Sequence, residues 1–328
     1  MKAICVPEVG RFLYSEVAVP VPAARELLVR VTVTGVCRTD LKIIEQGHRD
    51  LRLPRIPGEE IVGEVVGSGD PKDRGWLGQR VYVYPGTWCG TCDCCRRDAF
   101  NMCRDMRIAG FHRDGGFAEF VSVPRQTVIA LPDGLEDDVA VFAEPLSCCI
   151  NALEMARVTA GERLCIFGAG PAGTLLARLA AVRGAAVSVV DPDPVRASRH
   201  RHGVPFEGVY DVAIPAVGSA DAYREAFRCL APRGRLVAFS GLPTGASPTI
   251  DLNGLHYQEQ TVVGAYGCHY RHGEEAIRLL ARREIRTDDL VTHRYGLDQL
   301  ADALDVVRCR RGLKVLLYPG QSPARSFR

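Results

Sequence analysis

The pattern of apolar and polar residues changes character near the middle of the chain. Up to about residue 145, short runs of Val, Ile, Leu and aromatic residues are separated by Gly, Pro and Asp. Such runs occupy residues 26–36, 61–69, 79–85 and 117–124. Runs of this length and composition are typical of twisted β-strands. The first part of the chain is therefore expected to be an all-β region.

From about residue 146, strand-like and helix-like segments alternate. Buried strands are expected at residues 164–170, 185–191, 210–218 and 234–241. A helix with one apolar face is expected at residues 171–184. Strand and helix in succession indicate a doubly wound parallel sheet. Helical segments then return after residue 267, and the last strand is expected at residues 313–319.

One part of this second region is unusually short. Between Asp191 and the strand at Asp211 there is room for one helix and a very short strand at residues 201–207. The further crossover helix that a full doubly wound sheet carries is missing from the pattern. We therefore expect a smaller sheet on that side.

Composition narrows the function classes without deciding between them. The 328 residues are 47% hydrophobic and 24% charged, with a formal net charge of +2. A charge so near zero gives no electrostatic case for nucleic-acid or membrane binding, and two short basic runs are interpreted as solvated helix ends. No segment resembles a signal peptide or is long enough to span a membrane. The expected location is the cytoplasm.

A glycine-rich motif opens the helix at residues 171–184. Gly168, Gly170 and Gly173 form a G-x-G-x-x-G pattern that follows a strand. In that context the first glycine allows a tight turn, the second lets the backbone approach a pyrophosphate, and the third lets helix and strand pack closely. The pyrophosphate would lie at the helix N-terminus, where unpaired N–H groups favour anions. The motif predicts a dinucleotide site.

Asp191, at the end of the next strand, indicates which dinucleotide. Its carboxylate can accept hydrogen bonds from both adenine-ribose hydroxyls and would repel a 2′-phosphate, so NAD is favoured over NADP. Arg196 follows on the next helix, where it would either flank the adenosine or face solvent. The expected cofactor-binding set also includes Pro171, Ala172, Val217 and Gly241.

Five of the 13 cysteines are clustered in one short segment. The spacing is C-x2-C-x2-C-x7-C, formed by Cys89, Cys92, Cys95 and Cys103, and Cys94 is additional. Four thiolates in one loop can enclose a tetrahedral Zn²⁺ without an open position, which is a structural site. An iron–sulfur cluster is the alternative, since thiolates suit both metals. Zinc is favoured because no other cluster signature accompanies the cysteines.

Taken together and in this order, the motifs resemble the zinc-dependent medium-chain dehydrogenase/reductases, in the branch of alcohol, polyol and threonine dehydrogenases. The resemblance runs nearly from end to end. It is carried by GVCRTD, GEEIVGEVVGSG, the cysteine cluster, DGGFAEFVSVP, EPLSCCINAL, GAGPAG and LHYQEQTVVGAYG.

The resemblance implies an α/β fold of two domains. A GroES-like β domain that carries the active site would comprise residues 1–146 and 265–328, with a structural zinc lobe at residues 86–104. A Rossmann domain that binds NAD, its second half shortened, would comprise residues 147–264. The family also implies a homodimer or homotetramer joined at the edge strands of the Rossmann sheets.

For the catalytic metal, the resemblance implies four candidate ligands. Cys37 matches the family's first ligand, and Glu144 in the EPL motif matches the third ligand of the polyol branch. The family's next motif reads Gly-His-Glu, whereas this chain has Glu59 where the ligating His is expected. Glu60 matches the family's Glu, which can enter or leave the metal shell. The candidate set therefore holds one thiolate and three carboxylates, with no imidazole.

Two interpretations of this set remain open. A Cys, Glu, Glu shell is chemically possible for zinc, although its added negative charge lowers the Lewis acidity of the metal. Alternatively the metal has been lost, and the paired carboxylates then need a cation such as Lys42 or Lys314, or raised pKa values. His48 or His112 could supply the missing imidazole from elsewhere.

Other roles also follow from the resemblance. Thr39 matches the hydroxyl that accepts the alcohol proton. Lys42 stands where some alcohol dehydrogenases have a relay His, and it would bind the nicotinamide ribose, bind Glu60 or face water. Lys314 matches a basic residue near the pyrophosphate.

The expected activity is NAD-dependent oxidation of a secondary alcohol, namely a polyol, cyclitol or sugar-like substrate, by metal-assisted hydride transfer. One alternative is a metal-free reductase of an activated carbonyl or double bond. Another is a non-catalytic NAD-binding regulatory protein.

Overall fold

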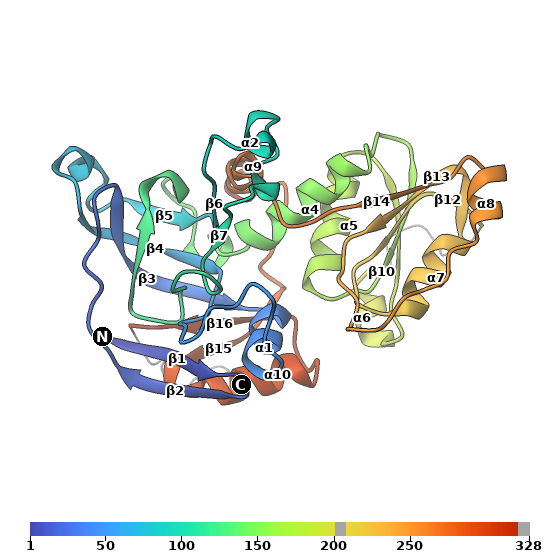
Figure 1. Ribbon diagram of the computed structural model, residues 1–328. Coiled ribbons are helices and arrows are strands. Elements are labelled where there is room, and N and C mark those ends of the chain that lie inside the picture. The colour runs from blue at the N-terminus through green and yellow to red at the C-terminus, as the bar shows by residue number, and fades with distance from the viewer. Residues whose placement is uncertain (201–207, 321–328) are drawn as a thin grey trace. The chain divides into compact units, whose positions relative to one another are not determined.

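The computed structural model describes residues 1–200 and 208–320 (Figure 1). The chain divides into two compact units, each described here by itself. The first comprises Met1–Glu144 and His269–Arg328, and the second comprises Pro145–Cys268. The expected short strand at residues 201–207 lies outside the described residues.

The first unit is built on a largely antiparallel sheet. Among the described residues its strand order is β15-β16-β3-β4-β5-β9, with β8 also paired to β3. The strands are β3 (Glu26–Val36), β4 (Glu60–Ser68), β5 (Arg80–Val83), β8 (Phe120–Pro124), β9 (Val128–Ala130), β15 (Val291–Gly296) and β16 (Lys314–Tyr318). The C-terminal strands β15 and β16 therefore complete a sheet that the N-terminal half begins.

Alternation along β3 explains how this sheet forms. Leu27, Val29 and Val31 point to one face and are at most 2% exposed. They pack with Val65 of β4 and Val81 of β5 in one apolar cluster. Residues two apart share a face of a strand, so this spacing directs one whole face of the sheet into a core.

Shorter elements surround the sheet. A hairpin of β1 (Lys2–Glu8) and β2 (Arg11–Glu16) precedes it. The remaining elements of this unit are η1 (Pro71–Trp76), β6 (Gly86–Thr87), α2 (Asp93–Arg96), η2 (Phe100–Met102), β7 (Arg107–Ile108), η3 (Arg125–Thr127), α3 (Asp137–Ala140), α9 (Tyr270–Ala281), η4 (Leu297–Gln299) and α10 (Leu300–Arg308).

The expectation of an all-β region up to residue 145 is incomplete, because α1 (Arg38–Glu45) follows β3 directly. Leu41 and Ile44 are buried on one side of this helix and join a second apolar cluster with Leu304 of α10. One apolar face of two turns is too short a signal to recognise in the sequence, because a helix of this length depends on tertiary packing, here against α10.

The second unit is a parallel sheet with helices on its faces (Figure 1). Its elements are α4 (Ala143–Met155), which starts two residues before the unit, β10 (Arg163–Phe167), α5 (Pro171–Val182), β11 (Ala186–Val190), α6 (Pro194–Ser198), β12 (Tyr210–Pro215), α7 (Ala220–Arg228), β13 (Leu230–Ala238), α8 (Leu252–Tyr257) and β14 (Thr261–Gly264). Every strand pair in the described sheet is parallel.

The strand order of this sheet is β11-β10-β12-β13-β14. The order reverses at β10, which is the position where doubly wound sheets bind ligands at the carboxyl ends of their strands. Among the described residues, β11 has no strand beyond it. On that side the described sheet ends at β11, and the short strand expected at residues 201–207 lies outside the described residues.

Candidate functional site

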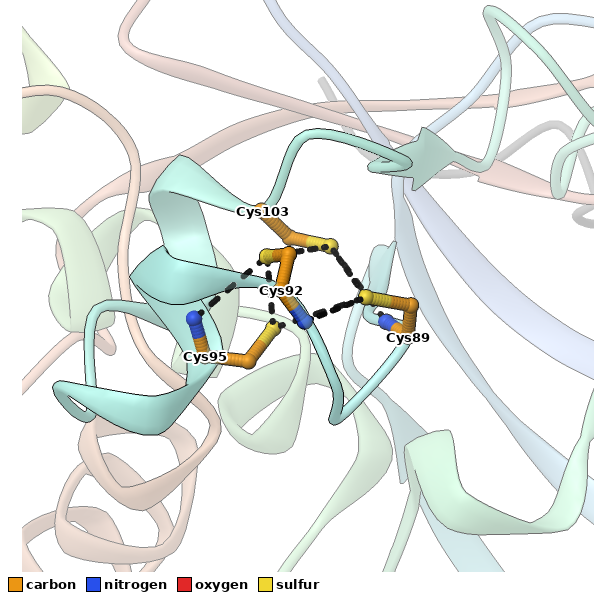
Figure 2. A group of neighbouring side chains, drawn as sticks. All are labelled: Cys89, Cys92, Cys95 and Cys103. Carbon is orange, nitrogen blue, oxygen red and sulfur yellow. Dashed lines mark hydrogen bonds between the residues drawn. The ribbon is translucent and has the colours of Figure 1, made fainter.

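The four cysteines of the lobe converge on one point (Figure 2). Cys89 lies before α2, Cys92 caps that helix, Cys95 lies within it, and Cys103 follows η2. Their sulfur atoms are separated by 3.5 Å (Cys92 to Cys95), 3.6 Å (Cys103 to Cys89) and 4.0 Å (Cys89 to Cys95). Four sulfurs at about 2.3 Å from a tetrahedral Zn²⁺ lie about 3.8 Å apart, so the donor set fits zinc.

Backbone N–H groups also point at these sulfurs. The amides of Thr91 and Cys92 donate to Cys89 Sγ, and the amide of Cys95 donates to Cys92 Sγ. Hydrogen bonds from the side chain and amide of Thr91 lower the pKa of Cys89 to about 6. Backbone hydrogen bonds also lower the pKa of Cys92, whereas burial raises the pKa values of Cys95 and Cys103. Because a metal binds the thiolate, Cys89 and Cys92 are the two sulfurs most ready for a cation. Cys94 is not part of the four-sulfur group.

An aromatic stack holds the lobe against the C-terminal part of the same unit. Phe100 stacks on Trp88 with ring centroids 5.1 Å apart and on His269 at 4.5 Å. His269 Nδ1 accepts the Arg271 amide, and Nε2 lies 3.2 Å from Oδ1 of Asp98. The sequence gives no signal for the contact of His269 with the lobe, because Asp98 lies about 170 residues away in the chain.

The second candidate metal site lies where β3 ends and β4 begins. Cys37 is the N-cap of α1, and its amide donates to Oδ2 of Asp40 at 2.8 Å. Glu59 directly precedes β4, and both Cys37 and Glu59 are half-buried. The Cys37 Sγ lies 4.0 Å from the Glu59 Oε1. A sulfur and a carboxylate oxygen at zinc-ligand distances from one ion lie about 3.5 Å apart, so this pair fits a shared cation after a small adjustment.

The acidic side chains around Cys37 and Glu59 lie close together, so their negative charges repel one another. Burial, then the carboxylates of Glu144, Asp40 and Glu60, raise the pKa of Glu59 well above its ordinary value. Burial and the neighbouring Asp40, Glu59 and Glu60 also raise the pKa of Cys37 well above its ordinary value. Burial raises the pKa of Asp40 to about 6. Such a cluster must take up protons or a cation.

Glu60 already has a cation. Its carboxylate forms an ion pair with Nζ of Lys314, and both side chains are at most 3% exposed. Burial opposes the charged form of Lys314, but Glu60, Cys37 and Glu144 outweigh this effect and raise the pKa of Lys314. Of the two lysines that the sequence offers as partners, the structure brings Lys314 to Glu60, while Lys42 lies exposed on α1.

The four candidate ligands of the catalytic metal do not all converge on one point. Among the described residues, no three of Cys37, Glu59, Glu60 and Glu144 bring ligand atoms within 4.8 Å of one another. Glu144 nevertheless contributes to the charge at Glu59, as its effect on that pKa shows. The half-buried Thr39 is the second residue of α1.

The two histidines that could supply an imidazole are engaged locally. Nδ1 of His48 accepts the Asp50 amide, and Nδ1 of His112 accepts the Ile108 amide. Neither forms a ligand group with Cys37 or Glu59 in the described part of the chain. Burial lowers the pKa of both histidines.

In the second unit, the glycine-rich turn joins β10 to α5. Gly168 has φ +112°, a conformation that a side chain disfavours. A Cβ at Gly173 would overlap the carbonyl oxygen of Gly168, so the third glycine is required for close packing. A Cβ at Gly170 would meet only Arg196 Nη1, at 3.7 Å, which leaves open space in front of the helix N-terminus. Pro171 and Ala172 start α5 there.

Asp191 lies beside the turn. Its Oδ2 accepts the Ala169 amide at 2.7 Å, and its Oδ1 accepts the Asp193 amide at 2.9 Å. A carboxylate has about four acceptor positions, so ribose hydroxyls can still bind it. Arg196 lies 3.7 Å from the carboxylate of Asp193 and is 16% exposed at its side chain.

The ends of the next two strands complete this edge of the sheet. Val217 follows β12 and lies 3.5 Å from where a Cβ at Gly168 would be. A Cβ at Gly218 would overlap the carbonyl oxygen of Gly241, which follows β13. Gly218 was not among the residues expected from the sequence, because its need arises from contact with another strand end.

Comparison with known proteins explains why these sites occur together. Residues 23–133 match the model of the alcohol dehydrogenase GroES-like domain, and residues 206–282 match that of the zinc-binding dehydrogenases. The L-threonine 3-dehydrogenase of Pyrococcus furiosus is 32% identical to the chain, with 94% of this chain and 95% of that protein covered. The chain belongs to the zinc-dependent medium-chain dehydrogenases.

This dehydrogenase has further relatives of similar length. The L-galactonate-5-dehydrogenase of Escherichia coli is 29% identical over 96% of this chain and 98% of that protein. A solved zinc-binding dehydrogenase from Sinorhizobium meliloti bound to NADP has a TM-score of 0.91 and 29% identity, with 97% and 99% of the two chains covered. The expected fold class and family are confirmed, and the protein is an oxidoreductase that acts on CH–OH groups.

No helix among the described residues is both long enough and apolar enough to cross a membrane.

Proposed function

We propose that this dehydrogenase oxidises a secondary alcohol of a polyol, cyclitol or sugar-like substrate with NAD. The observation that carries the proposal is the pairing of Cys37 with Glu59, 4.0 Å apart, in the unit that contains the GroES-like domain. L-galactonate-5-dehydrogenase and sorbitol dehydrogenase, which match nearly the whole chain, are named for polyhydroxylated substrates.

Cys37, Glu59 and Glu144 would hold the catalytic metal. Bound zinc would act as a Lewis acid that polarises the alcohol oxygen, and bound NAD would accept the hydride. Thr39 would accept the alcohol proton through its hydroxyl and pass it toward solvent. The exposed Lys42 would contact the nicotinamide ribose or face water.

The cofactor would bind at the glycine-rich turn. The open space at Gly170 supports a pyrophosphate at the start of α5, and Asp191 would accept the ribose hydroxyls. Arg196 would border the adenosine, and Val217 and Gly241 would border the nicotinamide half. Lys314 was expected near the pyrophosphate, but its ion pair with Glu60 supports a role in the metal site instead.

A homodimer or homotetramer is part of the proposal. Strand β14 is an edge of the described sheet, and its burial pattern is mostly exposed. Val262 on this strand and Tyr266 after it are 39% and 50% exposed. Pairing with the same strand of a second copy would cover this apolar edge. The 13 cysteines all lie in described residues and none forms a disulfide, which is consistent with a cytoplasmic location.

A metal-free reductase on the same fold is the second candidate. Both carboxylates beside Cys37 can be neutralised without a metal. Lys314 pairs with Glu60, and the raised pKa of Glu59 lets that group carry a proton. Only the structural lobe would then hold zinc.

The test is NADH formation from NAD across a panel of polyols, cyclitols, sugar acids and amino alcohols. Turnover of at least one, lost in Cys37→Ser, supports the proposed dehydrogenase. Binding of NAD without turnover of any member contradicts it. Reduction of activated carbonyls or alkenes that persists in Cys37→Ser would support the metal-free candidate.

A further inference from the structure

A row of residues crosses three adjacent strands beside the candidate catalytic metal site. Leu316 of β16 lies opposite Gly35 of β3, and Gly35 lies opposite Glu60 of β4. Directly opposed residues in a sheet point to the same face. Lys314 shares the face of Leu316, because the two lie two residues apart in β16, and the backbone of Cys37 is still extended just past the end of β3, two residues after Gly35. Lys314, Cys37 and Glu60 therefore approach one another on one face.

Gly35 provides the space that brings Lys314 to Glu60. A Cβ at Gly35 would overlap the carboxylate of Glu60 and lie 2.8 Å from Cε of Lys314. Any larger residue at this position would occupy the space in which the two side chains meet. The missing side chain in the middle strand lets a lysine reach a carboxylate two strands away.

The ion pair is enclosed from every side that the structure describes. Both side chains are at most 3% exposed, and Nζ of Lys314 lies 5.9 Å from the centre of the Phe142 ring. A charge pair shielded from water is held firmly, since neither partner can exchange the other for solvent without a large desolvation cost. Glu60 is therefore fixed over Gly35.

The arrangement matters because Glu60 adjoins Glu59, which faces Cys37. In the proposed site, the three anionic ligands Cys37, Glu59 and Glu144 would together exceed the charge of one divalent ion. A fourth from Glu60 would add more negative charge and fill the position that a substrate needs, since catalytic zinc sites keep one position open. Because Glu59 stands where the family has a histidine, the site contains one carboxylate more than a metal with an open position would bind.

We propose that Lys314, reaching across Gly35, is a positioning residue that holds Glu60 out of the catalytic metal shell and so keeps one metal position open. The inference rests on the metal site of the proposed function. In this proposal Glu60 pairs with Lys314, and Glu59 binds the metal.

The experiment uses the full-length protein loaded with Co²⁺, which reports ligand number through its visible d–d bands. Subtracting the spectrum of Cys37→Ser removes the contribution of the four-cysteine lobe. Imidazole is then titrated as a probe of the open position. The variants are Lys314→Met, Glu60→Gln and the double variant, and Lys314→Arg is the conservative replacement.

The wild type and Glu60→Gln should bind imidazole with similar affinity. Lys314→Met should bind it at least tenfold more weakly, because the released Glu60 fills the open position. The double variant should recover the wild-type affinity and difference spectrum, and Lys314→Arg should recover part of both. A role in stability alone would not produce this recovery.

Three outcomes would overturn the inference. If Lys314→Met leaves imidazole binding unchanged, the lysine does not control the metal shell, although the proposed function stands. If Glu60→Gln alone loses Co²⁺ from the Cys37 site, Glu60 is a ligand. If wild type and Cys37→Ser give the same spectrum, no metal occupies this site, and the metal-assisted function fails together with the inference. Should Lys314→Met not fold, Lys314→Gln, which removes the charge but keeps a polar side chain, takes its place, and unchanged imidazole binding in that variant overturns the inference.

Discussion

The thiol of Cys37 lies 4.0 Å from a carboxylate oxygen of Glu59, at the position where the family is expected to have an imidazole. A carboxylate at this place keeps a ligand for a divalent cation, but it makes the site more anionic. Because burial and neighbouring charges raise the pKa values of both groups, they release protons readily only when a cation replaces them.

Glu59→Gln is therefore expected to lower metal affinity at the Cys37 site by at least tenfold, since an amide oxygen is a weaker zinc ligand than a carboxylate. Chelator competition, followed by metal analysis, measures the change. Glu64→Gln is the matched control, because Glu64 lies in β4, the strand that Glu59 directly precedes, and pairs with Arg30 at the surface. Equal metal retention in both variants would show that Glu59 is not a ligand.

The cysteine lobe offers a second matched pair of variants. Cys103→Ser removes one of the four converging sulfurs, so it should lose the structural metal and lower the melting temperature by several degrees. Cys94→Ser, in the same lobe but outside the four-sulfur group, should keep both. Metal content and thermal unfolding measure the two effects. Loss of metal in Cys94→Ser with retention in Cys103→Ser would reverse the assignment.

Cofactor choice is expected to depend on Asp191. Asp191→Ala should weaken NAD binding by about 10- to 100-fold, the effect of losing one or two charge-assisted hydrogen bonds. NADP binding should fall less or improve, because the repulsion of the 2′-phosphate is removed. Fluorescence titration gives both affinities. Asp193→Ala, which removes the cap of α6, is the control. An unchanged ratio of NAD to NADP affinity in Asp191→Ala would contradict the assignment.

Acid sensitivity of the second unit should depend on Glu162. Burial alone would raise the pKa of Glu162, but hydrogen bonds from the Thr159 amide and Arg235 outweigh it and lower that pKa. A lowered folded-state pKa contributes stability above the unfolded pKa, near 4.5, and that contribution disappears as the pH falls below it.

Glu162→Gln should therefore cost about 1–3 kcal/mol of unfolding free energy at pH 7, and less at pH 3. Urea unfolding at several pH values measures the difference. Glu225→Gln, which breaks an exposed pair with Arg228, should change stability by less than about 0.5 kcal/mol. A cost for Glu162→Gln that grows as the pH falls would show the opposite linkage.

Features encoded by local spacing could be predicted from the sequence. The four sulfurs of the lobe lie within 15 residues, so their convergence depends on one loop. The glycine-rich turn is likewise local, because its three glycines lie within six residues directly after β10.

Features that depend on strand register could not be predicted. Glu60 and Lys314 are far apart in the sequence, and their contact requires β3 to lie between their strands with Gly35 at the crossing. Without that register, Lys42 and Lys314 were equal candidates. The stacking of His269 on Phe100 was missed for the same reason, because α9 returns to the lobe from the other end of the chain.

The central claim is that a metal is bound at Cys37 with Glu59 in place of an imidazole. Metal content per chain, measured on the purified wild type and on Cys37→Ser, tests it most directly. The proposed dehydrogenase should carry two metal ions in the wild type and one, in the cysteine lobe, in Cys37→Ser. A single ion per chain in both proteins would contradict the claim.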